Sequence, residues 1–127
     1  MLGDKNVTAT LAVKDLEAAK KFYQETLGLK PGQGQDEGGQ LYQSGDSYLF
    51  IYPSQFAGTN QATAATWTAG EDFVKIIQDL EGKGVKFEQY DNIPGATRDG
   101  NVHSFGELKA AWFKDPDGNI LNVINKM

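Results

Sequence analysis

The order of patterned segments along the chain repeats once, and this repeat limits the possible folds more than any other feature. Each half holds an alternating apolar segment, a helical apolar stripe, a glycine stop and further short strands. A repeated supersecondary unit indicates that neither half buries its own sheet face alone. We therefore expect an α+β fold, in which two strand–helix–three-strand (βαβββ) modules form a curved, cup-shaped mixed sheet with helices on its outer face.

The first half predicts a strand, a helix and further strands. Residues 7–13 alternate between apolar and polar or small side chains, which is typical of a strand with one buried face. Asp15 is expected to cap the next helix, and Gly28 lies where a helix C-cap belongs. The later turns and strand of this half are expected at residues 31–34, 37–39 and 48–52, the last ended by Pro53. The apolar residues expected to face the helix are Val7, Leu11, Val13, Leu49 and Ile51.

The second half repeats this order. Residues 64–69 predict a strand, and an apolar stripe from Phe73 to Leu80 predicts a helix. Gly84 follows that stripe in the same local context as Gly28. The rest of this half predicts a polar loop at 91–105 and a hairpin with strands at 108–113 and 120–124 around a turn at 115–118. Leu121 and Val123 are expected to face the second helix.

Length and composition indicate one domain over residues 1–127. We expect module one at about residues 5–53, a linker at about 54–63 and module two at about 64–127. The chain has no cysteine, so it forms neither a disulfide nor a thiolate metal site. No apolar run approaches the roughly 18 residues of a membrane span, and the first residues lack a signal-peptide pattern. A cytoplasmic protein with no membrane partner is therefore expected.

The charge balance is acidic, with a net charge of −5 and a pI near 4.7. Phosphate backbones repel such a surface, so a nucleic-acid partner is not expected. An acidic groove would suit a cationic ligand. The simpler interpretation is that mild acidity only keeps the protein soluble.

Two segments resemble the signatures of a known family. The segment VKDLEAAKKFY at residues 13–23, followed by LGL at 27–29, resembles the first strand–helix join of the vicinal oxygen chelate (VOC) superfamily, which includes glyoxalases, bleomycin-resistance proteins and extradiol dioxygenases. The segment AWFKDPDGNI at residues 111–120 resembles the last hairpin of that superfamily. Both segments are parts of the scaffold, so they indicate the fold and say little about the chemistry.

The resemblance also indicates where a metal would be held. The metal enzymes of this superfamily bind one divalent ion with four side chains inside the cup, and these positions fall here on Thr8, Phe50, Ala64 and Asn122. Iron, nickel and zinc sites use imidazole or carboxylate donors, which none of the four residues supplies. The only histidine, His103, lies in the predicted polar loop and is expected to be solvated. We therefore expect no metal and no cofactor.

The strand faces opposite the helices are expected to line the cup with rings, hydroxyls and one amide. Such a lining suits a flat, partly polar organic ligand, although aromatic residues at strand spacing also serve simply as core. The residues expected to bind the ligand are Thr8, Thr10, Tyr48, Phe50, Tyr52, Thr66, Trp112 and Asn122, beside Ala110 and Ile120.

The leading hypothesis is a metal-free protein that binds a small molecule, as the resemblance to bleomycin-resistance proteins implies. The alternative is a metal-independent enzyme of the isomerase or lyase type, although threonine and tyrosine are poor general bases at neutral pH. A third hypothesis is an accessory protein that acts through an exposed apolar patch. No catalytic residue is assigned. The remaining charged residues are expected at a helix start (Glu71, Asp72), in a turn (Asp115, Asp117) and at loops or the cup rim (Glu37, Arg98, Glu107).

We further expect a homodimer in which both chains contribute to each cup. The resemblance implies this, because many members of the superfamily pair or exchange modules across a two-fold axis. The polar linker is long enough either to fold back or to reach a neighbouring chain. Pairing would also cover exposed sheet edges, which otherwise promote aggregation.

Overall fold

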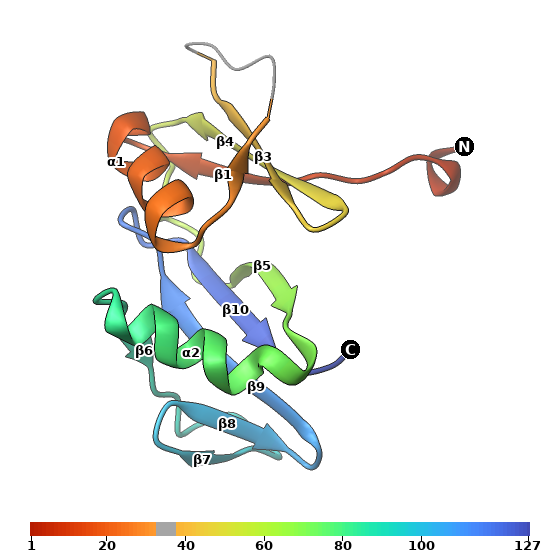
Figure 1. Cartoon of the computed structure of the whole chain (residues 1–127), viewed down its shortest axis with the longest axis vertical. Helices are drawn as coiled ribbons and strands as arrows, with labels where there is room; N and C mark the ends of the chain where they lie inside the picture. The colour runs from red at the N-terminus through yellow and green to blue at the C-terminus, as the bar shows by residue number, and fades with distance from the viewer. Residues whose placement is uncertain (33–37) are drawn as a thin grey trace.

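The computed structural model describes residues 1–32 and 38–127 (Figure 1). Its longer elements are β1 (Ala9–Val13), α1 (Leu16–Lys21), β3 (Gln40–Ser44), β4 (Ser47–Pro53), β5 (Thr63–Thr68), α2 (Phe73–Gly82), β8 (Val102–Phe105), β9 (Leu108–Lys114) and β10 (Ile120–Ile124). The short strands are β2 (Lys30–Pro31), β6 (Phe87–Glu88) and β7 (Thr97–Asp99), and the short helical turns are η1 (Leu2–Asp4), η2 (Phe22–Thr26) and η3 (Gly70–Asp72). The expected α+β class is confirmed. Among the described residues, no helix is long and apolar enough to cross a membrane.

Module one comprises β1 to β4 and α1, and its sheet has the strand order β1-β4-β3-β2. β1 runs parallel to β4, with Leu11 opposite Ile51, while β3 and β4 are antiparallel. Leu11, Val13, Leu49 and Ile51 are at most 3% exposed. The predicted inward face of these two strands is therefore confirmed at these four positions.

The prediction for Val7 was wrong. The strand begins at Ala9 rather than Val7, and Val7 is 91% exposed. Its pairing stops where Ala9 lies opposite Leu49, because β4 turns into its hairpin with β3 just beyond that point. Without a partner strand, the residues before Ala9 have no sheet face to bury.

Module two comprises β5 to β10 and α2, and its sheet is larger than the predicted copy of module one. The strand order is β5-β10-β9-β8-β7, with β6 also paired to β9. The polar loop expected at residues 91–105 instead contains the hairpin of β7 and β8, in which Arg98 lies opposite His103. The expected hairpin of β9 and β10 is present, and Gly118 has a φ of +93° in its turn.

The predicted helix boundaries are set by local chemistry. The Asp15 carboxylate accepts hydrogen bonds from the backbone N–H groups of Glu17 and Ala18, as an N-cap does. Gly28 and Gly84 both have positive φ, at +77° and +90°. After α2, the N–H of Gly84 donates to the carbonyl of Glu81 and the N–H of Val85 to that of Leu80, which is the Schellman pattern.

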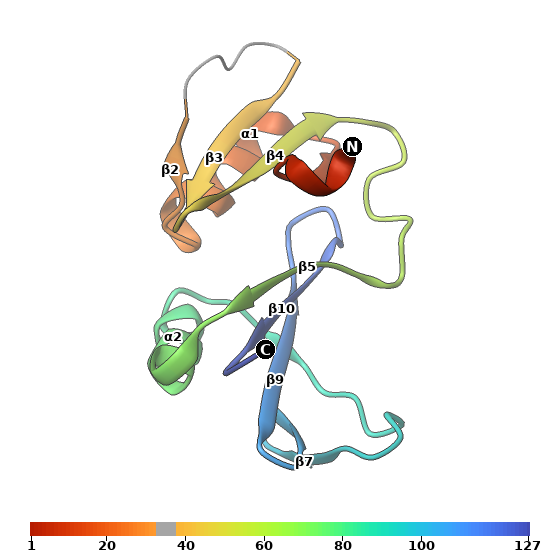
Figure 2. The ribbon, with the colours of Figure 1, turned by 90° about the vertical axis from the view of Figure 1, so that its right-hand side faces the viewer.

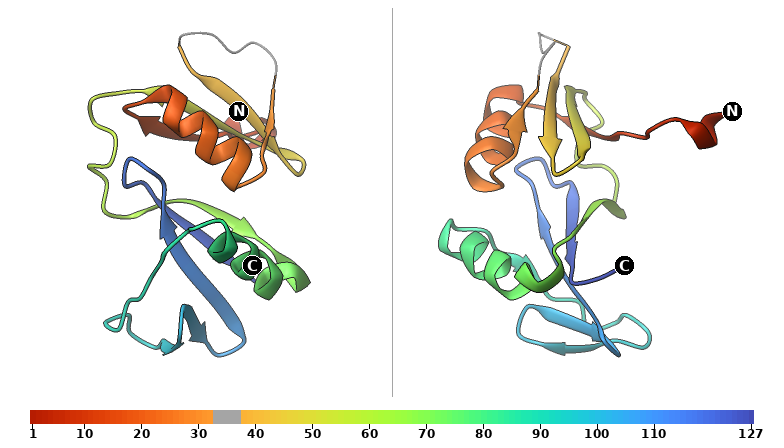
Figure 3. Two further views of the ribbon diagram at one scale, coloured as in Figure 1. Left: turned by 60° about the vertical axis from the view of Figure 1, so that its left-hand side comes forward. Right: turned by 45° about the vertical axis from the view of Figure 1, so that its right-hand side comes forward.

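The helix-covered faces of the two sheets merge into one hydrophobic core that contains Tyr23, Tyr42, Phe73 and Phe113. Both helices lie on the same side of the molecule, and both chain termini lie on the other side (Figures 1 and 3). The two sheets are hydrogen-bonded separately, with the edge strands β1 and β5 in contact. The faces opposite the helices, which we call the cup faces, are therefore turned toward the side of the termini.

The linker between β4 and β5 runs along the outside of the molecule, beside the β9–β10 turn (Figure 2). Gly58 has a φ of +75°, and a Cβ at this position would lie 1.9 Å from the carbonyl oxygen of Asp117. Only glycine fits this approach without movement of the backbone. The linker is thus fixed against module two at its midpoint.

Candidate functional site

The cup face of module two is built on β9 and β10. Trp112 lies opposite Asn122 in the register of these strands, and Thr66 of β5 lies opposite Asn122 on its other side. The indole N–H of Trp112 donates to the hydroxyl of Thr63 at 3.0 Å, and the amide of Asn122 donates to that of Thr66 at 3.3 Å. These bonds hold the indole and the amide in fixed orientations across three strands.

Tyr90, His103 and Trp112 form an aromatic cluster on this face. The ring centroids of His103 and Trp112 are 5.0 Å apart and those of Tyr90 and Trp112 are 5.6 Å apart, both in edge-to-face geometry. His103 reaches the cup face because it pairs with Ala110 of β9. Its side chain is fully buried, so the expectation of a solvated histidine was wrong.

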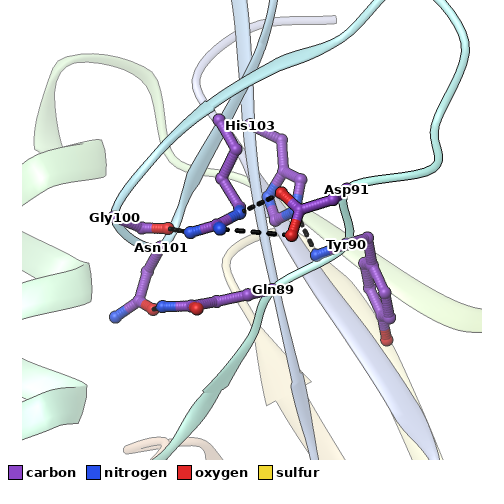
Figure 4. Close-up of polar contacts among 7 residues, drawn as sticks. Gln89, Tyr90, Asp91, Gly100, Asn101 and His103 are labelled. Carbon is purple, nitrogen blue, oxygen red and sulfur yellow. Dashed lines mark hydrogen bonds and ion pairs between the residues drawn. The ribbon is translucent and has the colours of Figure 1, made fainter.

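His103 holds the loop after β6 against the sheet. Its Nε2 accepts a 2.9 Å hydrogen bond from the backbone N–H of Tyr90, so the neutral ring carries its proton on Nδ1. The guanidinium of Arg98 binds both carboxylate oxygens of Asp91 and the carbonyl of Gly100, as Figure 4 shows. Together these contacts fix the position of Tyr90 beside Trp112.

A cavity of about 860 Å³, which we call the cup cavity, opens beside this cluster. Its walls are the end of the linker, the loop from Glu88 to Ile93 and the cup face of β9 and β10 at Trp112 and Ile120. Glu88 forms an ion pair with Lys114 across the cavity wall, with 3.5 Å between Oε1 and Nζ. The volume falls within the range of about 300–1,000 Å³ that small-molecule sites occupy.

The charges at the cavity are set by their neighbours. Burial, and then the nearby carboxylate of Glu88, raise the pKa of the Tyr90 hydroxyl. At neutral pH this phenol therefore stays protonated and is able to donate a hydrogen bond. The hydrogen bond from Arg98 lowers the pKa of Asp91, which keeps that carboxylate ionised.

Two buried polar atoms on the cup face of module two have no hydrogen-bond partner among the described residues. These are the Oδ1 of Asn122 and the Nδ1 of His103. A buried polar group without a hydrogen bond costs about 1–3 kcal/mol. Native proteins retain few such groups, so both atoms are candidates for a hydrogen bond to water or to a ligand.

The cup face of module one carries the other aromatic residues predicted for the site. Phe50 and Tyr52 lie on β4 with their rings nearly parallel, at an interplanar angle of 8° and a centroid distance of 6.4 Å. Tyr48 and Tyr52 are 45% and 37% exposed. These residues form a second, more open aromatic surface.

The family model for the Glyoxalase/Bleomycin resistance protein/Dioxygenase superfamily matches residues 6–123. The chain belongs to this superfamily. No curated protein sequence matches the chain. The VOC resemblance of the strand–helix join and of the last hairpin is therefore confirmed at the level of the superfamily.

Several solved structures share the VOC fold. One is a bleomycin resistance determinant encoded on the transposon Tn5, with 20% identity and a TM-score of 0.70 over 96% of this chain and 98% of that chain. Another is a lactoylglutathione lyase from Agrobacterium tumefaciens, with 17% identity and a TM-score of 0.69 over 94% and 92% of the two chains. A third is the fosfomycin resistance protein FosX from Mesorhizobium loti, with 12% identity and a TM-score of 0.69 over 98% and 93%. At these identities they show a common fold and no more.

The structure groups the predicted VOC ligand residues into two sets. Trp112, Thr66 and Asn122 lie on the module-two cup face, and Trp112 lines the cup cavity. Thr10, Tyr48, Phe50 and Tyr52 lie on module one and do not line that cavity, while Thr8 is exposed just before β1. Ile120 lines the cavity, while Ala110 is buried and does not line it. Of the predicted rim charges, Arg98 binds Asp91, Glu107 binds Lys126 at 2.8 Å, and Glu37 lies outside the described residues.

Sequence reasoning missed Tyr90, His103 and Glu88 as parts of the site. One signal was available for Glu88, because it follows Phe87 and must point to the opposite sheet face. No local pattern marks Tyr90 or His103, whose positions depend on the loop and on the β7–β8 hairpin.

The residues at the VOC metal positions do not fit a transition-metal ion. Phe50 and Ala64 have no donor atom, and Thr8 and Asn122 offer only neutral oxygens. The described part of the chain contains no group of three His, Asp or Glu side chains able to hold a metal. The donor set therefore argues against the metal chemistry of the superfamily.

Proposed function

We propose that this VOC protein binds a small, flat, partly polar organic molecule without a metal ion, and that the ligand enters the cup cavity beside Trp112. The observation that carries the proposal is the cavity of about 860 Å³ bordered by the Tyr90 and Trp112 rings. Aromatic rings supply a large contact area and stacking surface for a flat ligand. Their edge-to-face packing and the loop bonds to His103 and Arg98 keep this surface preorganised.

Polar groups around the rings would orient the ligand. The Tyr90 phenol supplies a donor, and the carboxylate of Glu88 supplies an acceptor beside Lys114. A ligand donor would also satisfy the Oδ1 of Asn122 if the cup face adjusts to expose it. A few such polar groups in a mostly aromatic site are typical of small-molecule recognition.

The bleomycin resistance determinant with the same fold is named for resistance, which offers one functional parallel. We extend this parallel to a sequestering role for the present chain. A cytoplasmic location is retained as a prediction from the sequence.

We also propose that the binding unit is a homodimer. The exposed rings of Tyr48 and Tyr52 on module one would complete the cup cavity on module two of a second copy. Such pairing would bring the two groups of predicted ligand residues into one site.

A thermal-shift screen against aromatic metabolites and antibiotics tests the binding proposal, because a ligand that binds only the native state raises the melting temperature. A ligand that stabilises the wild-type protein should lose most of this effect with Trp112→Ala. The matched control is Phe87→Ala, which removes a ring from the helix-covered face of the same sheet, at a residue that lines neither described cavity. Equal loss in both variants, or one equivalent of tightly held iron, nickel or zinc per chain, would overturn the proposal.

One observation favours the alternative of a metal-independent enzyme. The Glu88 carboxylate lines the cup cavity, where a bound substrate could reach it. His103 is less suited as a base, since its Nε2 already accepts from Tyr90 and the ring is buried. Turnover of any ligand found in the screen, abolished in Glu88→Gln with binding retained, would support an enzyme.

A further inference from the structure

A second cavity lies on the helix side of the molecule, where the two modules meet. Its volume is about 420 Å³, and we call it the inter-module pocket. Module one contributes the segment from Leu27 to Lys30 and the β3–β4 turn, while module two contributes the end of β5, one face of α2 and the sheet beneath it. Among the residues that the structure describes, the pocket shares none of its lining with the cup cavity.

The register of the sheet places this pocket on the face opposite the cup. Trp67 lines the pocket and lies opposite Val123 in the pairing of β5 with β10. The neighbouring pair, Thr66 and Asn122, points to the cup face. Successive side chains along a strand point to opposite faces of the sheet, so the two cavities are separated by the thickness of the sheet.

The interior of the inter-module pocket is apolar. Leu80, Phe113 and Val123 form its buried floor and belong to the main core. The half-buried side chains of Leu27, Leu29 and Ile76 form its walls. Water in such a cavity finds few hydrogen-bond partners, so an apolar group would replace it favourably.

The mouth of the pocket carries a cation and a free hydroxyl donor. Lys30 lies at the edge, and its ammonium group forms no ion pair or hydrogen bond with any described residue. The Ser44 hydroxyl accepts a 2.9 Å hydrogen bond from the indole N–H of Trp67 and donates to no described group. A carboxylate at this point would receive a hydrogen bond from Ser44 and the charge of Lys30.

We propose that the inter-module pocket is a second binding site, which takes a small amphipathic carboxylate with its apolar chain on Phe113 and Leu80 and its head group at Lys30 and Ser44. The proposal is independent of the cup ligand. The hydrogen bond between Trp67 and Ser44 is part of the pocket wall, and it also joins the two modules. A ligand bound in the pocket would therefore also affect how the modules pack against each other.

Octanoate is a suitable probe, with 1-octanol as the uncharged analogue of the same chain length. In a Trp112→Phe background, Trp67 is the only tryptophan, and its fluorescence reports directly on the pocket. We expect saturable changes with both probes. Lys30→Gln should weaken octanoate about two- to fivefold, the size of a partly solvated ion pair, and leave 1-octanol unchanged.

A filling variant tests the location. Ala69→Leu adds apolar volume at the pocket wall and should abolish the response to both probes, with Ile76→Phe as a second variant should the first fail to fold. Circular dichroism and thermal melting establish that each variant is folded. Equal octanoate affinity in the Lys30→Gln protein, or an unchanged response in a folded filling variant, would overturn the proposal.

Discussion

The hydroxyl of Tyr23 donates a 2.7 Å hydrogen bond to Oδ2 of Asp115, and this buried contact joins two residues that are 92 positions apart. Tyr23 follows α1 in module one, while Asp115 begins the β9–β10 turn of module two. Asn119 strengthens the same junction, because its amide donates both to Asp115 and to the carbonyl of Ala12 on β1. A turn residue thus also holds the two modules together.

We predict that Tyr23→Phe destabilises the protein by about 1.5–3 kcal/mol, since it removes a buried hydrogen bond to a charged acceptor. Burial, and then the charge of Asp115, raise the pKa of the Tyr23 hydroxyl, so this hydroxyl keeps its proton at an alkaline pH where an ordinary tyrosine ionises. The matched control is Tyr42→Phe, which loses a bond to the neutral Gln24 within module one and should cost about 0.5–1.5 kcal/mol. Urea unfolding measures both losses, and a larger loss for Tyr42→Phe would contradict this ranking.

We predict that Gly58→Ala is more harmful than an alanine at an open glycine with a similar backbone. Gly95 has a φ of +79°, and a Cβ there would meet no atom within 4 Å. Both substitutions suffer the unfavourable φ of about 1–2 kcal/mol, but only Gly58→Ala forces the linker away from Asp117. The difference between the unfolding free energies of the two variants measures the cost of the clash between a Cβ at position 58 and Asp117. Equal unfolding free energies would show that the linker shifts freely.

The parts of the fold that could be predicted depend on neighbours in sequence. The Asp15 cap, the Gly84 stop and the turn at Gly118 are local, and each was expected from residues within about five positions. The inward faces of β4 and β10 were equally readable, because side chains alternate along a strand.

The parts that could not be predicted depend on distant partners. Thr97, Arg98 and Asp99 form β7 although all three are polar and exposed, so they show no apolar alternation. Their strand exists because β8 lies beside them, and β8 in turn pairs with β9. The burial of His103 follows from this pairing, and with it the position of Tyr90 at the cup.

We predict that Asp117→Asn stabilises the protein at neutral pH and has little effect in acid. Burial is the main cause that raises the pKa of Asp117, with the N–H of Lys14 opposing it. The folded state therefore binds the proton more tightly than the unfolded chain, and stability falls as the pH rises through the window between the two pKa values. Thermal melts from about pH 3 to pH 8 should show a growing advantage for the amide variant. An advantage that grows toward low pH would have the wrong sign.

We predict that His103→Phe costs about 1–3 kcal/mol, because the backbone N–H of Tyr90 loses its acceptor while the aromatic packing is kept. The comparison variant is His103→Gln, because the side-chain carbonyl of glutamine again offers an acceptor to the backbone N–H of Tyr90. Hydrogen exchange at the Tyr90 amide separates the two, with faster exchange expected in the phenylalanine variant. Equal protection of this amide in wild type and His103→Phe would show that the histidine does not fasten the loop.

The last prediction concerns assembly. Tyr48, Tyr52 and Phe56 are exposed by 45%, 37% and 67%, and a second copy that covers them would remove a large apolar area from water. Light scattering at micromolar concentration should therefore give twice the 13.9 kDa mass of one chain. Tyr52→Glu should shift the protein to monomer, because a charge would be buried in the shared cup. Val74→Glu is the control, since Val74 is a 59% exposed apolar residue on α2, on the helix side. A wild-type monomer at this concentration would contradict the dimer, and the cup cavity would then have to bind its ligand with the residues of one chain.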